Sequence, residues 1–185
     1  MAEPMQVAKR QNQALAALRS TQRNQYLTFT LGGETYAMEI QFIREVIQYG
    51  GLTVVPLMPD FLRGVINLRG AVVPVIDLSM RFQRSPTEPT RHTCIVILEV
   101  GRENRMATLG IMVDNVSEVL EILGEDIEPA PSFGSSLRSN FIQGMGKVGS
   151  QFVIILDVNH VVSTDELATL TTGQEGLPRA ETPLP

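Results

Sequence analysis

The chain has little of what most enzymes and disulfide-stabilised proteins use. Cys94 is the only cysteine among 185 residues, which excludes a disulfide within one chain and a cysteine-rich metal site. The two histidines, His92 and His160, do not stand in a metal-ligand spacing with a carboxylate pair. The one glycine-rich run, "GMGKVGS" (144–150), precedes a strand-like segment, whereas a phosphate-binding loop precedes a helix. We therefore expect a protein that is not an enzyme and has no cofactor or metal.

The sequence also lacks tryptophan and long apolar runs. Aromatic residues make up 5% of the chain, which leaves few candidates for stacking on nucleic-acid bases. No stretch approaches the roughly 20 apolar residues that a membrane-spanning helix needs. The alanine-leucine cluster at 14–18 is too short for a secretory signal. We expect a cytosolic protein that does not insert into membranes.

Charge is unevenly distributed along the chain. Residues 1–24 contain four basic side chains and one acidic one, a balance of +3, which leaves −8 for the remainder of a chain whose total is −5. Phosphate contacts need clustered lysine and arginine, so an acidic folded region is not expected to bind nucleic acid. With 43% apolar residues, the chain can bury one sizeable core or two small ones of about 70 residues each.

The chain does contain many short strand-like segments separated by turn residues. "YLTFTL" and "ETYAMEI" flank Gly32-Gly33 and have the signature of a hairpin. Pro74 has no N–H, so its strand is expected to be an edge strand or to have a bulge. Short helical turns are expected after Asp77 and Asp157, and a last helix from Ser163. The other strand-like segments are "REVIQ", "GVINL", "AVVPVI", "TCIVILEV", "RMATLGIMV", "SEVLEI", "FIQGMGKV" and "QFVIIL", a spacing typical of a mainly all-β barrel or sandwich.

The chain also contains an internal repeat. Shifted by 80 residues, "FLRGVINLRGAVVPVIDL" (61–78) aligns without a gap with "FIQGMGKVGSQFVIILDV" (141–158). Shifted by 73 residues, "IQFIREVI" (40–47) aligns with "VDNVSEVL" (113–120). Two windows in the same order indicate a duplicated unit. Each unit has about five short strands, and five antiparallel strands can close into a small barrel filled by side chains.

The repeat predicts how the chain is divided into domains. We expect a folded region over 25–170 that consists of two barrels, the first over about 35–85 and the second over about 95–155, with exchange of strands between them possible. Residues 1–24 are expected to form a mobile basic extension. Residues 171–185 contain too little apolar surface to fold and are expected to be a disordered tail.

Positions that match between the repeats are explained by what both barrels need to fold. Gly64 and Gly144 match, which indicates a tight backbone at both places. Arg69 does not match, because the residue aligned with it is Gly149. It lies beside Gly70 in a two-residue bend, where an arginine suits recognition of a carboxylate on a partner or on its own chain. The alternative is that Arg69 is a solvated turn residue.

Several segments of the chain are distinctive in combination. They are "FTLGGETYAMEIQFIREVIQ", a following "VP" step, "GVINLRGAVVPVIDL", "GIMVDNVSEVLEI" and "IEPAP". Together they resemble the CheW-like coupling proteins of bacterial chemotaxis, with a match over about residues 25–170. The resemblance implies two packed SH3-like five-stranded barrels. It also implies an adaptor without catalysis, which binds the regulatory domain of a CheA-type histidine kinase and the cytoplasmic tip of methyl-accepting chemoreceptors in arrays at the membrane.

The resemblance further implies a surface for the receptor. Arg69 matches the arginine of the family's "NLRG", and Glu45 matches the acidic residue of its "V/I-x-E-V" strand. Our hypothesis is that these two side chains lie close enough to orient one another, while Gly64 keeps the adjacent backbone low. For Glu45 a purely structural role is the alternative, since Glu118 occupies the equivalent place in the other repeat.

A second surface, for the kinase, is implied by apolar residues. Leu27, Ile40 and Ile43 align with positions that form an apolar docking patch in the family. The alternative is that all three are core residues. Two other functions stay open at this point: a related adaptor in a pathway that controls pili or second messengers, and a ligand-binding SH3-like barrel.

Overall fold

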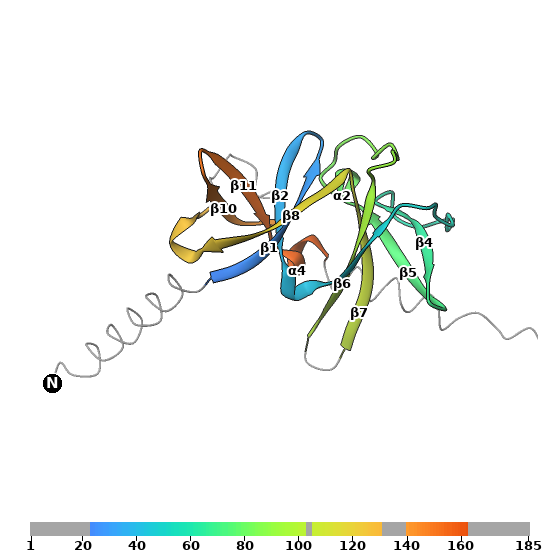
Figure 1. Ribbon diagram of the computed structural model, residues 1–185. Helices are drawn as coiled ribbons and strands as arrows, with labels where there is room; N and C mark the ends of the chain where they lie inside the picture. Colours follow the sequence, from blue (N-terminus) through green and yellow to red (C-terminus); the bar gives the residue numbers. More distant parts are fainter. Residues whose placement is uncertain (1–22, 103–104, 131–139, 163–185) are drawn as a thin grey trace, which may run out of the picture.

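Two small curved β-sheets lie side by side in this protein (Figure 1). The computed structural model describes residues 23–102, 105–130 and 140–162. The strands and short helices are, in chain order, β1 (Arg23–Leu31), β2 (Glu34–Glu39), the 3-10 helix η1 (Ile40–Phe42), β3 (Ile43–Gln48), β4 (Leu62–Leu68), β5 (Ala71–Asp77), α2 (Leu78–Arg81), β6 (Cys94–Arg102), β7 (Arg105–Val113), β8 (Asn115–Leu123), the 3-10 helix η2 (Gly124–Asp126), β9 (Ile127–Glu128), β10 (Ile142–Val148), β11 (Gln151–Leu156) and α4 (Val158–Val161).

Each sheet combines strands from both halves of the chain. One sheet, which we call barrel one, has the order β3-β6-β7-β5-β4, and the other, barrel two, has the order β8-β1-β2-β11-β10-β9. The first hairpin, β1–β2, therefore lies in barrel two among strands of the second half, as its blue ribbon beside β10 and β11 shows in Figure 1. The hairpin β6–β7 lies in barrel one. The sheets are thus not the contiguous ranges of about 35–85 and 95–155, because the two halves exchange their leading hairpins, an exchange that the sequence analysis left possible.

The internal repeat appears in the geometry as well as in the sequence. In the β4–β5 pair the register shifts between Leu62 and Gly64, and in the β10–β11 pair it shifts at the equivalent place, between Ile142 and Gly144. β5 then pairs in parallel with β7, as β11 pairs in parallel with β2. Both units therefore have the same strand, bulge and crossover pattern, in agreement with the duplicated unit that the two aligned windows predicted.

The helical turns begin where the sequence predicted them. Asp77 is the N-cap of α2, and its side chain accepts hydrogen bonds from the first backbone N–H groups of that turn. Asp157 is the N-cap of α4 in the same way. The backbone N–H groups of the two aspartates donate to the carbonyl oxygens of Phe61 and Phe141, both at 2.8 Å. The two aspartates therefore make the same backbone hydrogen bond in each repeat.

The ends of the folded region differ slightly from the expected ones. Arg23 and Asn24 belong to β1 because they pair with β8, so they are not part of an extension over 1–24. The rest of that range lies outside the described residues. The helix expected from Ser163 and the tail expected over 171–185 also lie outside them.

The prediction for the strand of Pro74 was wrong in one respect. β5 is an interior strand of barrel one, between β7 and β4. A bulge is present in the β4–β5 pair, but the additional residue is Arg63 on β4. The parallel ladder between β5 and β7 begins only at Val75, so Pro74 interrupts no pairing with β7.

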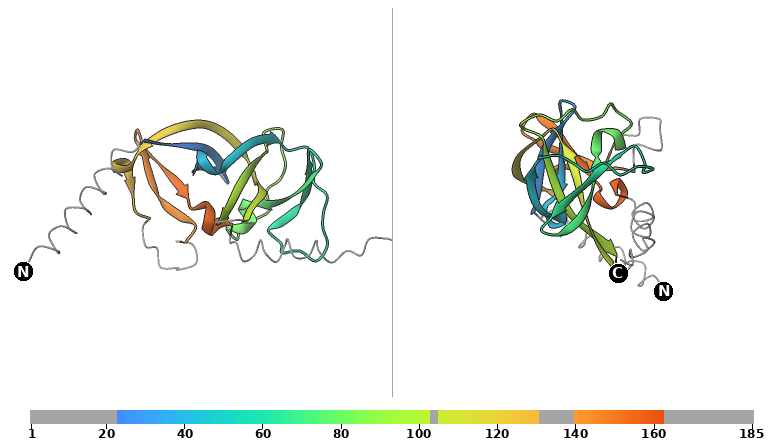
Figure 2. Two further views of the ribbon diagram at one scale, coloured as in Figure 1. Left: turned by 90° about the horizontal axis from the view of Figure 1, so that it is seen from below. Right: turned by 90° about the vertical axis from the view of Figure 1, so that its right-hand side faces the viewer.

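One apolar core is shared by the two barrels, and each barrel also has a smaller core of its own. The largest buried cluster contains Leu98 and Leu109 of barrel one, Phe29 and Met38 of barrel two, and Val161 of α4. Each of these side chains is at most 1% exposed. Burial on this scale is the main stabilising term in folding, so the barrels pack as one body, which Figure 2 shows as two lobes side by side.

Candidate partner-binding surfaces

Arg69 and Glu45 form a two-pronged ion pair on barrel one. The arginine Nη1 donates to Oε1 of the glutamate at 2.9 Å, and Nη2 donates to Oε2 at 3.0 Å. Glu45 lies on β3 and Arg69 on the β4–β5 turn, and β3 and β4 are the two outer strands of the sheet. The pair therefore joins the two edges of barrel one. The two side chains therefore lie close enough to orient one another, as our hypothesis stated. The Arg69 side chain is 68% exposed.

The backbone at Arg69 is in a conformation that favours glycine. Arg69 has φ 51° and Gly70 has φ 88°, so both central residues of this turn are left-handed. In the other repeat the first turn residue is Gly149, with φ 61°. A non-glycine residue in this conformation costs about 1–2 kcal/mol. The chain thus keeps an arginine in a left-handed conformation where the other repeat has a glycine.

Gly64 lies where the backbone closes barrel one. Thr53, in the segment after β3, exchanges two backbone hydrogen bonds with Val65, both 2.9 Å long. A Cβ atom at Gly64 would lie 2.4 Å from the carbonyl oxygen of Thr53. At Gly144 in barrel two, a Cβ atom would lie 2.8 Å from the carbonyl oxygen of Glu128. Both glycines therefore allow a close backbone crossing, as the repeat predicted.

We predict that Gly64→Ala lowers the free energy of unfolding by roughly 3 kcal/mol, because the new methyl group overlaps a backbone oxygen that cannot move freely. Gly33→Ala is the matched control. Gly33 also has a positive φ, of 83°, but nothing lies within 4 Å of its Cβ position, so its loss is about 1 kcal/mol from backbone strain alone. Urea unfolding followed by circular dichroism measures both. Equal losses in the two variants would contradict the role of Gly64 in closing the barrel.

The structure does not bring the three apolar candidates together on the surface. Leu27 is 7% exposed and belongs to the shared core, because β1 is an interior strand whose side chain at this position faces the other barrel. Ile40 lies on η1 and is 38% exposed. Ile43 is half-buried against the core. Of the three, Ile40 is the one that offers a partner an apolar surface.

Other exposed apolar side chains were missed in the sequence. Val46 lies next to Glu45, and its counterpart in the other repeat is Val119; Val72 and Phe152 are related in the same way. All four are exposed. The alternating pattern of a strand shows which residues share a face, but it does not show which face is covered, so the sequence alone did not single them out.

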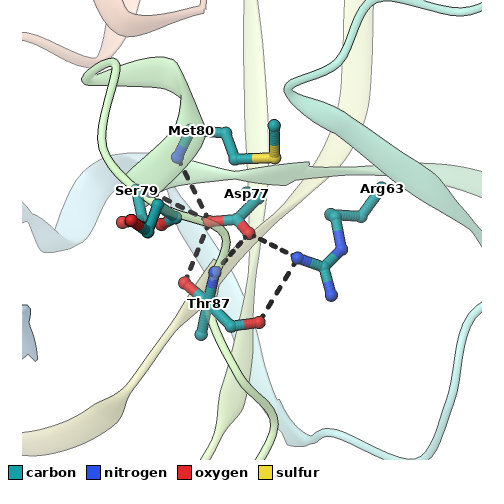
Figure 3. Close-up of polar contacts among 6 residues, drawn as sticks. Arg63, Asp77, Ser79, Met80 and Thr87 are labelled. Atoms are coloured by element: carbon teal, nitrogen blue, oxygen red, sulfur yellow. Dashed lines mark hydrogen bonds and ion pairs between the residues drawn. The ribbon is translucent and has the colours of Figure 1, made fainter.

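Asp77 is the centre of a buried polar cluster, shown in Figure 3. Its side chain is fully buried, and Arg63 Nη1 donates to its Oδ2 at 2.9 Å. Oδ2 also accepts from the Thr87 backbone N–H at 2.8 Å, and Oδ1 accepts from the Thr87 hydroxyl at 2.9 Å. The Ser79 and Met80 N–H groups donate to Oδ1 as well. With five donors around it, this carboxylate anchors the segment that follows α2, and no lone pair points into an open site for chemistry.

A groove of about 380 Å³ between the barrels contains a second polar cluster. Arg84 Nη2 and the Tyr36 hydroxyl both donate to Oε2 of Glu34, each at 2.9 Å. The hydrogen bond from Arg84 lowers the pKa of Glu34. Burial, followed by the hydrogen bond to Glu34, raises the pKa of Tyr36 to about 12. Both shifts move away from neutral pH, so neither group is suited to general acid–base catalysis.

Neither a metal-binding cluster nor a membrane-spanning helix is found among the described residues. Within them there is no group of three or more histidine, cysteine, aspartate or glutamate side chains placed to hold a metal ion. None of the helices in the same part of the chain has the length and apolar character needed to cross a membrane.

Comparison with known proteins relates this fold to one family. Residues 25–166 match the CheW-like domain. The chain is 36% identical over 144 residues to the chemotaxis protein CheW of Klebsiella aerogenes, which covers 78% of this chain and 84% of that protein. It is 29% identical over 150 residues to the chemotaxis protein CheW of Treponema pallidum, with 79% and 86% covered.

A solved structure has the same architecture. The scaffolding protein TtCheW from Thermoanaerobacter tengcongensis superposes with a TM-score of 0.68 at 30% identity, covering 78% of this chain and 91% of that one. The predicted fold, mainly β with two SH3-like barrels, is thereby confirmed. With a domain match over most of its length and relatives above 30% identity, the chain belongs to the family of CheW-like domain proteins.

Proposed function

We propose that this protein is a non-catalytic adaptor that couples methyl-accepting chemoreceptors to a CheA-type histidine kinase in chemotaxis signalling arrays. It acts in the cytoplasm and is recruited to the membrane through its partners. The observation that carries the proposal is the exposed Arg69–Glu45 pair on a CheW-like fold. The names of the relatives favour chemotaxis over a pathway for pili or second messengers, and over a ligand-binding barrel.

The receptor surface in this proposal is the edge of barrel one. A guanidinium has five N–H groups and the pair with Glu45 uses two, which leaves three for oxygen atoms on the receptor helices. Glu45 holds the guanidinium in one orientation, which lowers the entropy lost on binding. Gly64 contributes by keeping β4 close to the segment after β3.

The kinase surface in this proposal centres on η1. Ile40 presents an apolar side chain there, and Ile43 lies half-buried three residues later. Leu27 acts from inside the core, where it supports the same region without touching the kinase. Apolar residues at the centre of an interface supply much of the binding free energy.

We predict that Ile40→Asp weakens capture of the kinase regulatory domain about tenfold, because a charge replaces an apolar contact and must be desolvated. Phe152→Asp is the matched control, since Phe152 is an exposed apolar residue at 49% exposure on β11, and the parallel pairing of β11 with β2 places it at the end of β2 opposite to η1. Titration calorimetry with the purified domain measures both, after circular dichroism has shown that the variants fold. Equal affinities of Ile40→Asp and the unmodified chain would contradict this surface.

The proposed function as a whole is tested by capture from bacterial lysate. The full chain is the bait, and mass spectrometry identifies what is retained. We expect a histidine kinase and methyl-accepting receptors together. Recovery of neither would contradict the coupling function and would favour the ligand-binding barrel.

A further inference from the structure

A segment of four residues at the end of α2 connects barrel one with barrel two. We call Arg81–Arg84 the seam segment. The guanidinium carbon of Arg81 lies 4.8 Å from the ring centroid of Phe61 and 5.1 Å from that of Phe141. Its Nε donates to the carbonyl oxygen of Val161 at 3.0 Å. The two rings, one from each half of the chain, therefore contact the same guanidinium cation.

The repeat gives these contacts a symmetry. Phe61 and Phe141 are aligned by the shift of 80 residues, and the same shift aligns Arg81 with Val161. Arg81 thus contacts its own counterpart and lies between two residues that are counterparts of each other. Equivalent positions of the two repeats therefore meet around Arg81, where the two halves of the chain face one another.

The rest of the seam segment also contacts barrel two. The ring centroid of Phe82 lies 5.7 Å from that of Tyr36 and 5.8 Å from that of Phe141. Arg84 forms its 2.9 Å ion pair with Glu34 on β2. Three of the four residues of the seam segment therefore contact residues across the seam, and Arg81 and Phe82 share Phe141 as a partner.

A strained turn directs the seam segment toward barrel two. Gln83 has φ 60°, a left-handed conformation that costs a non-glycine residue about 1–2 kcal/mol. The Arg84 N–H donates to the carbonyl oxygen of Ser79 at 3.0 Å, and the Gln83 N–H donates to that of Met80 at 2.9 Å. This is the Schellman arrangement, which ends α2 and reverses the chain. The reversal brings Arg84 back to Glu34.

We propose that the seam segment sets the angle between the two barrels, with Arg81 as its main positioning residue. The shared apolar core supplies attraction, but the hydrophobic effect has no preferred direction, and two apolar surfaces can slide. A hydrogen bond and a cation held over two rings depend on direction and distance. The seam segment therefore selects one angle among those that the core allows.

The consequence for function depends on the proposed coupling role. The Arg69–Glu45 pair belongs to barrel one, while Ile40 lies on η1, the connection between β2 of barrel two and β3 of barrel one. A change in the angle between the barrels then moves this connection, and with it the orientation of a kinase relative to a receptor. A change of angle would alter the geometry of an array without removing either binding surface.

The test measures the distance between spin labels on the two barrels of the full chain without any partner. Val72→Cys and Phe152→Cys take the labels, in a Cys94→Ser background, because both side chains are exposed and occupy equivalent positions. We expect one narrow distance distribution with Arg81, and a broader distribution with a shifted maximum for Arg81→Met. Arg81→Lys keeps the cation, so its distance distribution should be narrower than that of Arg81→Met. A loss of stability alone would not change the distribution of distances between the labels in the folded chain.

Two outcomes overturn the inference. The first is the same narrow distribution in Arg81→Met and in the unmodified chain. The second applies if Arg81→Met does not fold: Arg81→Lys is then the deciding variant, and an unchanged distribution in it contradicts the role of the planar guanidinium. Because no partner is present, failure of the proposed coupling function is seen only in the lysate capture, and failure of this inference only in the distances.

Discussion

Asp77→Ala lowers the free energy of unfolding by about 3–5 kcal/mol, the largest loss that we expect from a single side chain in this protein. The substitution leaves the Arg63 guanidinium without its carboxylate and leaves the buried N–H and hydroxyl of Thr87 without an acceptor. Unfolding in urea, followed by circular dichroism, measures the loss. Faster hydrogen exchange at the Ser79 and Thr87 amides would show that the segment after α2 has lost its anchor.

The repeat supplies the matched control. Asp157 occupies the equivalent place, but its side chain is 30% exposed and accepts only from the backbone and ring nitrogens of His160 among the described residues. Asp157→Ala should therefore cost about 1 kcal/mol, the usual value for an N-cap. Equal losses at the two aspartates would mean that capping accounts for both, and that the contacts of Asp77 with Arg63 and Thr87 add nothing.

Arg69→Glu weakens capture of the chemoreceptor tip about thirtyfold, the effect of losing an interface arginine worth about 2 kcal/mol. The free energy of unfolding should change by no more than about 1 kcal/mol, because the pair with Glu45 is largely solvent-exposed on the arginine side. Surface plasmon resonance with an immobilised receptor hairpin measures the affinity. The exchanged double variant, Glu45→Arg with Arg69→Glu, should regain stability while its affinity stays low.

Arg69→Gly separates folding from binding at the same position. Glycine adopts the left-handed conformation without strain, which raises the free energy of unfolding by about 1–2 kcal/mol. The substitution also removes an exposed ion pair, which lowers it by about 1 kcal/mol at most. The variant should therefore be at least as stable as the unmodified chain, as Gly149 in the other repeat suggests. Full receptor affinity in Arg69→Gly would contradict a binding role for the guanidinium.

Part of the candidate site could be predicted from the sequence. The mismatch of Arg69 with Gly149 singled out a position where one repeat differs from the other, and the family resemblance placed Glu45 near it. The contact between their side chains is now seen at 2.9 Å and 3.0 Å. The burial of Leu27 could not be predicted, because an apolar residue in a strand has the same pattern whether it faces a core or a partner.

The polar contacts of Asp77 with distant residues likewise could not be predicted from the sequence. Its role as an N-cap depends on Ser79 and Met80, two and three residues later, and local spacing predicted it. The donors from Arg63 and Thr87 are 14 and 10 residues away, on a bulge and in an irregular segment. No local pattern specifies such contacts, since they depend on how the backbone bends between them.

The sequence alone determined the duplicated unit, the short strands, the two capped helical turns and the tight glycines. The strands and turns depend on neighbours within a few residues along the chain, and the duplicated unit and the glycines follow from comparing the repeats. Only the tertiary structure decided which strands pair. The two hairpins β1–β2 and β6–β7 lie in the barrel of the other half, so each core contains side chains from both units, such as Tyr26 with Ile122 and Ile95 with Val73. Strand alternation is the same in either arrangement, and the choice between them is made by the packing of the two halves against each other.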